Sequence, residues 1–123
     1  MKTVLVVEDH PIIRSTILLL LDDAGYHVLE APDADAAILL MESRPDIRVV
    51  FSDLEMPGSM DGLRLIHAIR ERWPPVILIL ASGRTPPLVT EMPVDTVFLR
   101  KPYRHGHLLN LLEAVEWDAA IPA

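Results

Sequence analysis

Four short runs of β-branched and aliphatic residues each lead directly into a polar side chain, and this pattern restricts the fold more than any other feature of the chain. The runs are residues 3–7, 47–51, 76–81 and 96–99. Runs of this length and composition are typical of strands that are buried on both faces of a parallel sheet. Segments with helical spacing of apolar residues lie between them, which is the pattern of repeated βαβ units. The sequence therefore predicts an α/β fold.

Helical segments are expected between these strands, together with a further strand at residues 27–31. Pro11 suits the first turn of a helix that Gly25 ends, and Asp33 and Asp61 can cap two more helices. These three helices are expected to end at about residues 24, 43 and 73, and a last helix is expected over about residues 104–117.

The segment between residues 82 and 95 is expected to contain a short fourth helix. Pro86, Pro87 and Pro93 allow at most one or two helical turns, around residues 88–92. Five strands and five helices would then account for the 123 residues, so one domain covering residues 1–123 is expected.

Composition and charge exclude several classes of function. The net charge of −7 argues against nucleic acid as a partner, because phosphate backbones are bound by clustered Lys and Arg. The absence of cysteine excludes disulfide, thiol and Cys-zinc chemistry. No apolar run approaches the roughly 18 residues of a membrane span, and the apolar start is too short for a signal peptide core. A cytoplasmic protein without membrane contact is therefore expected.

Three acids, a hydroxyl and a lysine follow the predicted strands. Glu8 and Asp9 follow the first run, Asp53 the second, Ser82 the third and Lys101 the fourth. In open parallel sheets the carboxyl ends of the strands line one crevice, so these side chains are expected to converge. Acids packed together repel each other unless a divalent cation neutralises them, and a lysine and a hydroxyl suit the oxygens of a phosphoryl group. The combination indicates a metal-assisted aspartyl-phosphate site.

The segments VLVVEDHP, VVFSDLEMPGSMDGL, ILILASG and VFLRKPY together resemble the receiver domain of two-component response regulators. They stand in the family's order and cover essentially the whole chain. The resemblance implies the (βα)5 flavodoxin-like topology, a doubly wound five-stranded parallel sheet with strand order 2-1-3-4-5. It also implies a single-domain signalling protein that turns over no independent substrate.

The resemblance assigns the central role to Asp53, which would be the phosphoacceptor. A carboxylate can attack phosphorus to form an acyl phosphate, whose later hydrolysis switches the protein off. Mg²⁺ would be held by Asp9, Asp53 and the backbone carbonyl of Glu55, and Glu8 would act mostly through a water. Calcium and manganese stay open as alternatives for the ion.

Ser82 and Lys101 would place a hydroxyl and a positive charge on the phosphoryl oxygens. The resemblance implies a cis peptide between Lys101 and Pro102 that aims the lysine into the crevice. Phe98 stands where receivers carry a switch aromatic, and since it has no hydroxyl it would act by filling space when Ser82 moves. A fixed core aromatic is the open alternative.

Glu55 and Arg84 stand two residues after the phosphoacceptor and after the serine, where receivers flank the path of the hydrolytic water. An ion pair between them would hinder that water and lengthen the phosphorylated lifetime. The alternative is two unpaired surface charges. The loop at residues 58–60 is one residue longer than the usual family version. The extra residue is expected to enlarge the loop beside the site without moving Asp53.

The expected function is transfer of a phosphoryl group to Asp53 from a phosphohistidine on a sensor histidine kinase or a histidine phosphotransfer protein. The downstream protein is not identified by the sequence. Receivers usually use the fourth helix, fifth strand and fifth helix for output or for a homodimer, and the leucine-rich last helix favours self-association.

Three alternatives stay open. The chain would act as a degenerate receiver if it bound a partner without phosphorylation, or it would be the receiver fragment of a longer regulator. The third is a phosphatase of the haloacid dehalogenase type, whose paired acids are similar to Asp53-Leu54-Glu55. That family is longer and places its nucleophile after the first strand, which does not match this chain.

Overall fold

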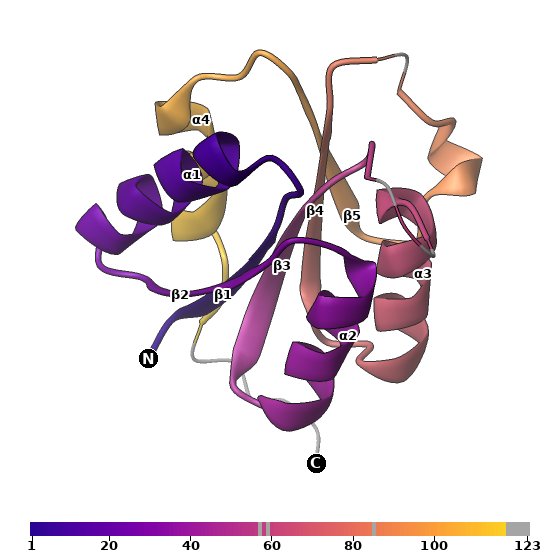
Figure 1. Ribbon diagram of the computed structural model, residues 1–123, viewed down its shortest axis with the longest axis horizontal. Helices are drawn as coiled ribbons and strands as arrows, with labels where there is room; N and C mark the ends of the chain where they lie inside the picture. Colours follow the sequence, from indigo (N-terminus) through magenta and orange to yellow (C-terminus); the bar gives the residue numbers. More distant parts are fainter. Residues whose placement is uncertain (57, 59, 85, 118–123) are drawn as a thin grey trace.

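The computed structural model, which describes residues 1–56, 58, 60–84 and 86–117, is built on a five-stranded sheet (Figure 1). The strands are β1 (Thr3–Val7), β2 (His27–Ala31), β3 (Ile47–Asp53), β4 (Ile77–Ser82) and β5 (Thr96–Arg100). They lie in the order β2-β1-β3-β4-β5, and every neighbouring pair is parallel. The predicted strand order is confirmed.

Two layers of helix cover the sheet. The helices are α1 (Pro11–Asp23), α2 (Ala34–Ser43), α3 (Gly62–Arg72) and α4 (His105–Glu113). Helices α1 and α4 lie on one face, and α2 and α3 lie on the other (Figure 1). Alternate side chains of β1 reach the two cores, with Leu5 and Val7 in the α2 and α3 layer and Val4 and Val6 in the α1 and α4 layer.

The predicted helix starts are confirmed by their caps. The Asp33 carboxylate accepts a hydrogen bond from the N–H of Ala36 at 2.8 Å, and the Asp61 carboxylate accepts one from the N–H of Arg64 at 2.9 Å. These bonds satisfy N–H groups that have no partner in the first turn of a helix. Pro11 is the first residue of α1, as expected.

The prediction of five helices is wrong for the described part of the chain, which contains four α-helices and one 3-10 turn. The turn is η1 (Val89–Glu91), and it stands where the short fourth helix was expected. The last helix ends at Glu113 instead of Trp117. The indole of Trp117 donates to the carbonyl of Leu112 at 2.9 Å, and the N–H of Val115 donates to the same carbonyl at 3.2 Å, so the chain turns away there. Among the described residues, no helix has the length and apolar character needed to cross a bilayer.

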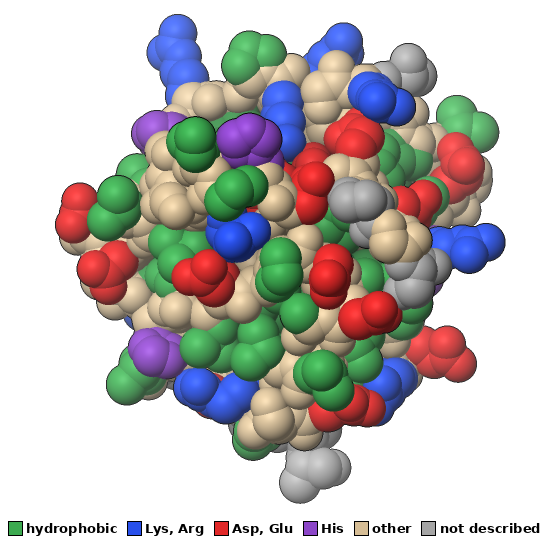
Figure 2. Space-filling model, in the orientation of Figure 1, with side chains coloured by type: hydrophobic (Ala, Val, Ile, Leu, Met, Phe, Trp, Pro, Cys, Tyr) green, Lys and Arg blue, Asp and Glu red, His purple; other side chains and the backbone are tan. Residues whose placement is uncertain are grey.

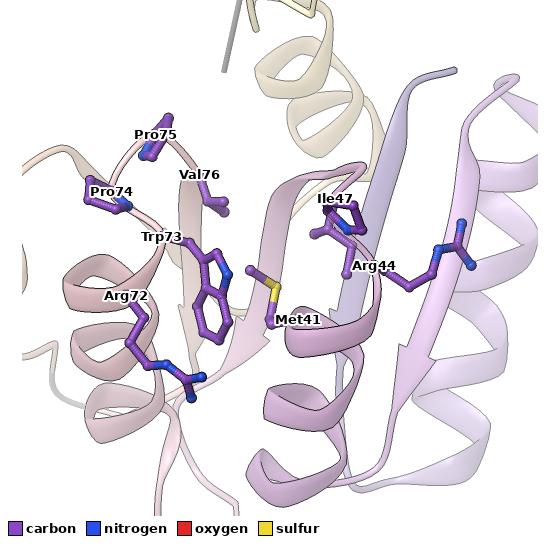
Figure 3. A pocket seen from close by; sticks show the side chains of 9 residues that line it. Met41, Arg44, Ile47, Arg72, Trp73, Pro74, Pro75 and Val76 are labelled. Atoms are coloured by element: carbon purple, nitrogen blue, oxygen red, sulfur yellow. The ribbon is translucent and has the colours of Figure 1, made fainter. Parts of the chain in front are cut away.

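A hollow of about 120 Å³ lies between the carboxyl ends of α2 and α3, beside the amino ends of β3 and β4 (Figure 3). Its walls include Met41 and Trp73, and Arg44 and Arg72 stand at its rim. The guanidinium of Arg44 is paired with Asp46 at 2.8 Å, and that of Arg72 with Glu42 at 2.7 Å. Both cations are therefore already paired, and the hollow is a mostly apolar recess at the opposite end of the sheet from the polar strand ends.

The amino end of α3 packs directly against the carboxyl end of β3. The N–H of Gly62 donates to the carbonyl of Leu54 at 2.9 Å. A Cβ atom at Gly62 would lie 2.0 Å from the carbonyl oxygen of Asp53, a separation that backbone atoms cannot tolerate. The absence of a side chain at Gly62 therefore sets how closely α3 approaches the end of β3.

We expect Gly62→Ala to destabilise the protein by about 2 kcal/mol, because the new methyl group must push α3 away from the backbone of Asp53. Gly106→Ala is the matched control, since Gly106 lies in α4 with no atom within 4 Å of the added Cβ. That change should stabilise by about 0.5 kcal/mol through helix propensity. Urea unfolding measures both, and equal effects of the two substitutions would contradict the packing argument.

The carboxylate of Asp46 ties the end of α2 to β1. It accepts hydrogen bonds from Arg44 at 2.9 and 2.8 Å and from the Thr3 hydroxyl at 3.1 Å. The bonds from Arg44 contribute most to lowering the pKa of Asp46 from its usual 3.8 to about 2. Because this pKa is lower in the folded protein than in the unfolded chain, the stabilisation is present above about pH 4 and is lost as the pH falls towards 2.

We therefore expect Asp46→Asn to lower the free energy of unfolding at pH 7 by about 0.5 to 1 kcal/mol, a small value because the pair is partly exposed. The difference from wild type should shrink between about pH 4 and pH 2. Urea unfolding at a series of pH values checks this. A difference that stays constant over that range would show that the Asp46 charge is not the cause.

Candidate functional site

The register of the sheet brings the polar strand ends to one edge. Val7 pairs with Ser52, Asp53 with Ala81, and Ser82 with Arg100. The residues that follow β1 and β5, together with the last residues of β3 and β4, therefore stand level at the carboxyl edge of the sheet. This is the upper edge in Figure 1.

Three carboxylates converge at this edge. One oxygen from each of Glu8, Asp9 and Asp53 lies within 4.8 Å of the others. Glu8 is 3% exposed and Asp53 8% exposed, whereas Asp9 is open to solvent. Burial is the main cause that raises the pKa of the Glu8 carboxyl. The hydrogen bond from the N–H of His10 and the charge of Lys101 lower this pKa, whereas the nearby Asp9 and Asp53 raise it. Oxygen ligands of this kind fit a hard divalent cation.

Lys101 supplies the positive charge of the site. Its Nζ donates to Asp53 Oδ1 at 2.9 Å and lies 3.6 Å from Glu8 Oε1. Burial lowers the pKa of Lys101, but the hydrogen bond to Asp53 and the charges of both acids outweigh burial and raise it. Burial raises the pKa of Asp53, and the bond from Lys101 opposes that effect. Each group therefore favours the charged form of the other.

The backbone around Lys101 has the conformation that the family resemblance implied. The peptide between Lys101 and Pro102 is cis. The N–H of Lys101 donates to the carbonyl of Ser82 at 2.8 Å, which continues the pairing of β4 and β5 beyond the last strand residue. This hydrogen bond holds the backbone of Lys101 beside the end of β4.

Ser82 is completely buried and has two partners. Its hydroxyl donates to the Glu55 carboxylate and accepts from the backbone N–H of Arg84 at 3.0 Å. The guanidinium Nε of Arg84 lies 4.0 Å from Glu55 Oε1, at the outer limit of an ion pair. The structure thus brings together the serine and the two residues expected to flank the mouth of the site.

Phe98 lies apart from this group of contacts. It is half-buried in β5 and packs against the core layer of α2 and α3. This placement is compatible with both a moving and a fixed aromatic. Ser59, in the loop expected to be enlarged, lies outside the described residues.

Tyr103 and Gly62 contribute to the site in ways that the sequence reasoning missed. Tyr103 lines a recess of about 10 Å³ with Glu8, Asp53 and Lys101, and its ring meets the ring of Phe51 edge-on at 5.9 Å. Burial raises the pKa of its hydroxyl. The signal available in the sequence was its position directly after Lys101-Pro102. Gly62 permits the close approach of α3 to the backbone of Asp53.

The surface around this edge carries both signs of charge. Figure 2 shows Lys and Arg side chains interspersed with Asp, Glu and hydrophobic side chains on the face viewed. A continuous basic area of the kind that binds a phosphate backbone is not seen on that face.

Comparison with known proteins identifies relatives over most of the chain. The response regulator receiver domain family matches residues 4–113. The putative response regulator NtrX-like of Rickettsia bellii (strain RML369-C) is 31% identical over 114 residues, a match that covers 89% of this chain and 24% of that protein. The chain thus spans about a quarter of the length of the NtrX-like relatives that it matches.

Two solved structures are similar over nearly their full length. The receiver domain of the hybrid histidine kinase CckA has a TM-score of 0.76 and 31% identity, covering 90% of this chain and 95% of that one. The chemotaxis protein CheY4 of Vibrio cholerae has a TM-score of 0.80 and 30% identity, covering 94% of this chain and 98% of that one.

Receiver domains are signalling modules of two-component systems. They interact with histidine kinases or phosphotransfer proteins, and they generally bind Mg²⁺ at an acidic pocket. In this chain, the acidic cluster of Glu8, Asp9 and Asp53 lies at the carboxyl edge of the parallel sheet, beside Lys101. Because the family match runs from the second residue of β1 to the last residue of α4, this chain belongs to the response regulator receiver domain family.

Proposed function

We propose that residues 1–123 act as a receiver that takes a phosphoryl group from a phosphohistidine onto Asp53 in a reaction that requires Mg²⁺. The donor is a sensor histidine kinase or a histidine phosphotransfer protein. The observation that carries this proposal is the 2.9 Å hydrogen bond between Lys101 and Asp53 beside two further carboxylates. A buried acid held by a lysine at the carboxyl edge of a parallel sheet is suited to nucleophilic chemistry.

Asp53 is the proposed nucleophile. One of its carboxylate oxygens forms a bond to phosphorus while the bond between phosphorus and the histidine nitrogen of the donor breaks. Burial raises the pKa of Asp53, and the hydrogen bond from Lys101 opposes this and favours the anion that the attack requires. The partial burial of the site also limits the access of water to the product.

The ion is proposed to bind to the carboxylates of Asp9 and Asp53 and to the backbone carbonyl of Glu55, while Glu8 acts through a water. All of these ligands are oxygens, as Mg²⁺ requires. The ion supplies positive charge that offsets the repulsion between these acids and the phosphoryl oxygens.

Lys101 and Ser82 are proposed to receive the phosphoryl oxygens. The lysine places a charge on them, and the serine hydroxyl donates a hydrogen bond, so both stabilise the charge that spreads over these oxygens during transfer. When Ser82 turns to this task, Phe98 on the neighbouring strand would fill the space that it leaves. Phosphoryl transfer at Asp53 would thereby be linked to a change in β5.

The output is proposed to be a protein contact, either regulated binding or onward transfer of the phosphoryl group, without turnover of an independent substrate. A homodimer is proposed to use η1, β5 and α4. Leu88, Val89 and Val94 support this surface, because they are 67%, 83% and 77% exposed in and beside η1.

Incubation with acetyl phosphate is expected to add one phosphoryl group to the wild-type protein when Mg²⁺ is present, and none to Asp53→Asn. The amide keeps the shape of the side chain and removes the nucleophilic charge. Intact mass spectrometry measures the gain. A gain that persists in Asp53→Asn would contradict the assignment of the phosphoacceptor, and no gain in the wild type would contradict phosphorylation by this donor.

Arg84→Ala is expected to shorten the phosphorylated lifetime about threefold, because the Glu55–Arg84 pair across the mouth of the site would no longer hinder water. Arg72→Ala is the matched control, since it breaks an Arg–Glu pair at the other end of the protein and should leave the lifetime unchanged. Loss of the phosphoryl mass over time gives both rates. If Arg84→Ala decays like the wild type, the pair does not act as a gate.

A further inference from the structure

The hydroxyl of Ser82 already has a partner in this structure. It donates its proton to the Glu55 carboxylate, and its oxygen accepts from the backbone N–H of Arg84. A serine hydroxyl has one proton to donate. Since Ser82 is completely buried, it has no solvent-facing alternative for that proton. A phosphoryl oxygen can therefore gain the Ser82 hydroxyl only if Glu55 gives it up.

The charge of Glu55 also acts on Asp53. Burial raises the pKa of Asp53 most, and Lys101 lowers it. The charge and the hydrogen bonding of Glu55 then raise this pKa further. Glu55 follows β3 by two residues, so its side chain bridges the gap between the ends of β3 and β4. This carboxylate therefore occupies the hydroxyl of Ser82, which stands one residue beyond the strand partner of Asp53, and a phosphoryl group on Asp53 would need that hydroxyl.

We propose that the Glu55 carboxylate holds the place of the phosphoryl group when Asp53 carries none, and that it swings to Arg84 when the phosphoryl group enters. The inference rests on the proposed function, because it assumes that Asp53 is the phosphoacceptor. The proposed role of Glu55 is more than that of a barrier to hydrolysis, because Glu55 also competes with the phosphoryl oxygens for the Ser82 hydroxyl when the aspartyl phosphate forms.

Charge makes the displacement necessary. A phosphoryl group on Asp53 brings additional negative charge towards Ser82, and two anions that compete for one donor repel each other. Arg84 offers Glu55 a new position. Its Nε is 4.0 Å away, and its side chain is 82% exposed and so has room to follow the carboxylate, which is itself 28% exposed.

The exchange links two events that would otherwise be separate. Entry of the phosphoryl group releases Glu55 from Ser82, and the released carboxylate closes on Arg84. The Ser82 hydroxyl then turns to the phosphoryl oxygens. Arg84 accordingly assists formation of the phosphorylated state by receiving Glu55, and Glu55 opposes it by occupying Ser82.

The test uses beryllium fluoride with Mg²⁺, a phosphoryl mimic that binds carboxylates, on the full chain, with calorimetry as the readout. Glu55→Gln keeps the size and the hydrogen-bond acceptor of the side chain and removes its charge. This variant should bind beryllium fluoride about tenfold more tightly than the wild type does. Glu55→Ala, which removes the acceptor as well, should also bind more tightly. Arg84→Ala should bind about threefold more weakly, because Glu55 loses its alternative position.

The decisive arm is the double substitution. In the Glu55→Gln background, Arg84→Ala should have no further effect, because there is no charge left to receive. Glu42→Gln is the matched control, since it removes the charge from the Glu–Arg pair at the other end of the protein and should leave binding unchanged. The initial rate of phosphorylation by acetyl phosphate, followed by intact mass, should change in the same order.

Two outcomes would overturn the inference while leaving the proposed function in place. One is that the wild type binds beryllium fluoride and Glu55→Gln binds it no more tightly. The other is an Arg84→Ala effect of the same size in both backgrounds. If neither the wild type nor any variant bound beryllium fluoride or gained a phosphoryl group, the proposed function itself would fail, and the inference with it.

Discussion

The acids at the carboxyl ends of β1 and β3 need positive charge close to them, and this requirement shapes the rest of the site. Glu8 and Asp53 are almost fully buried, where a carboxylate loses most of its hydration. One ammonium group, that of Lys101, lies within 3.6 Å of both. Two of the three clustered carboxylates therefore share one lysine. The remaining negative charge is what a hard cation bound by oxygen ligands would neutralise.

The fold and the convergence of the site could be predicted because both follow from local signals. Runs of β-branched residues give the strand ends, and a parallel sheet places those ends at one edge. Asp53 and Lys101 meet across 48 residues largely for this reason. The caps at Asp33 and Asp61 were predictable for a similar reason, since each carboxylate reaches an N–H group three residues ahead.

The features that were missed depend on contacts that no local pattern contains. The bond between Ser82 and Glu55 joins side chains 27 residues apart, and many rotamers of each would avoid it. The need for glycine at position 62 appears only when α3 is packed on the backbone of β3. The early end of α4 depends on the Trp117 indole finding the carbonyl of Leu112. Helical periodicity continues past that point and therefore predicts a longer helix.

The same buried hydroxyl connects the site to the edge of the sheet. Ser82 pairs with Arg100 in the parallel register, and Leu80 pairs with Phe98 two positions earlier. On the proposed mechanism, a shift of Ser82 would therefore act on β5. Between β4 and β5, the described residues contain the single turn η1 in place of a full helix, so few repeated backbone hydrogen bonds resist movement there. On the proposed mechanism, a change in the partner of Ser82 would therefore reach the exposed side chains around η1 more readily than it would reach the tightly packed α2 and α3 layer.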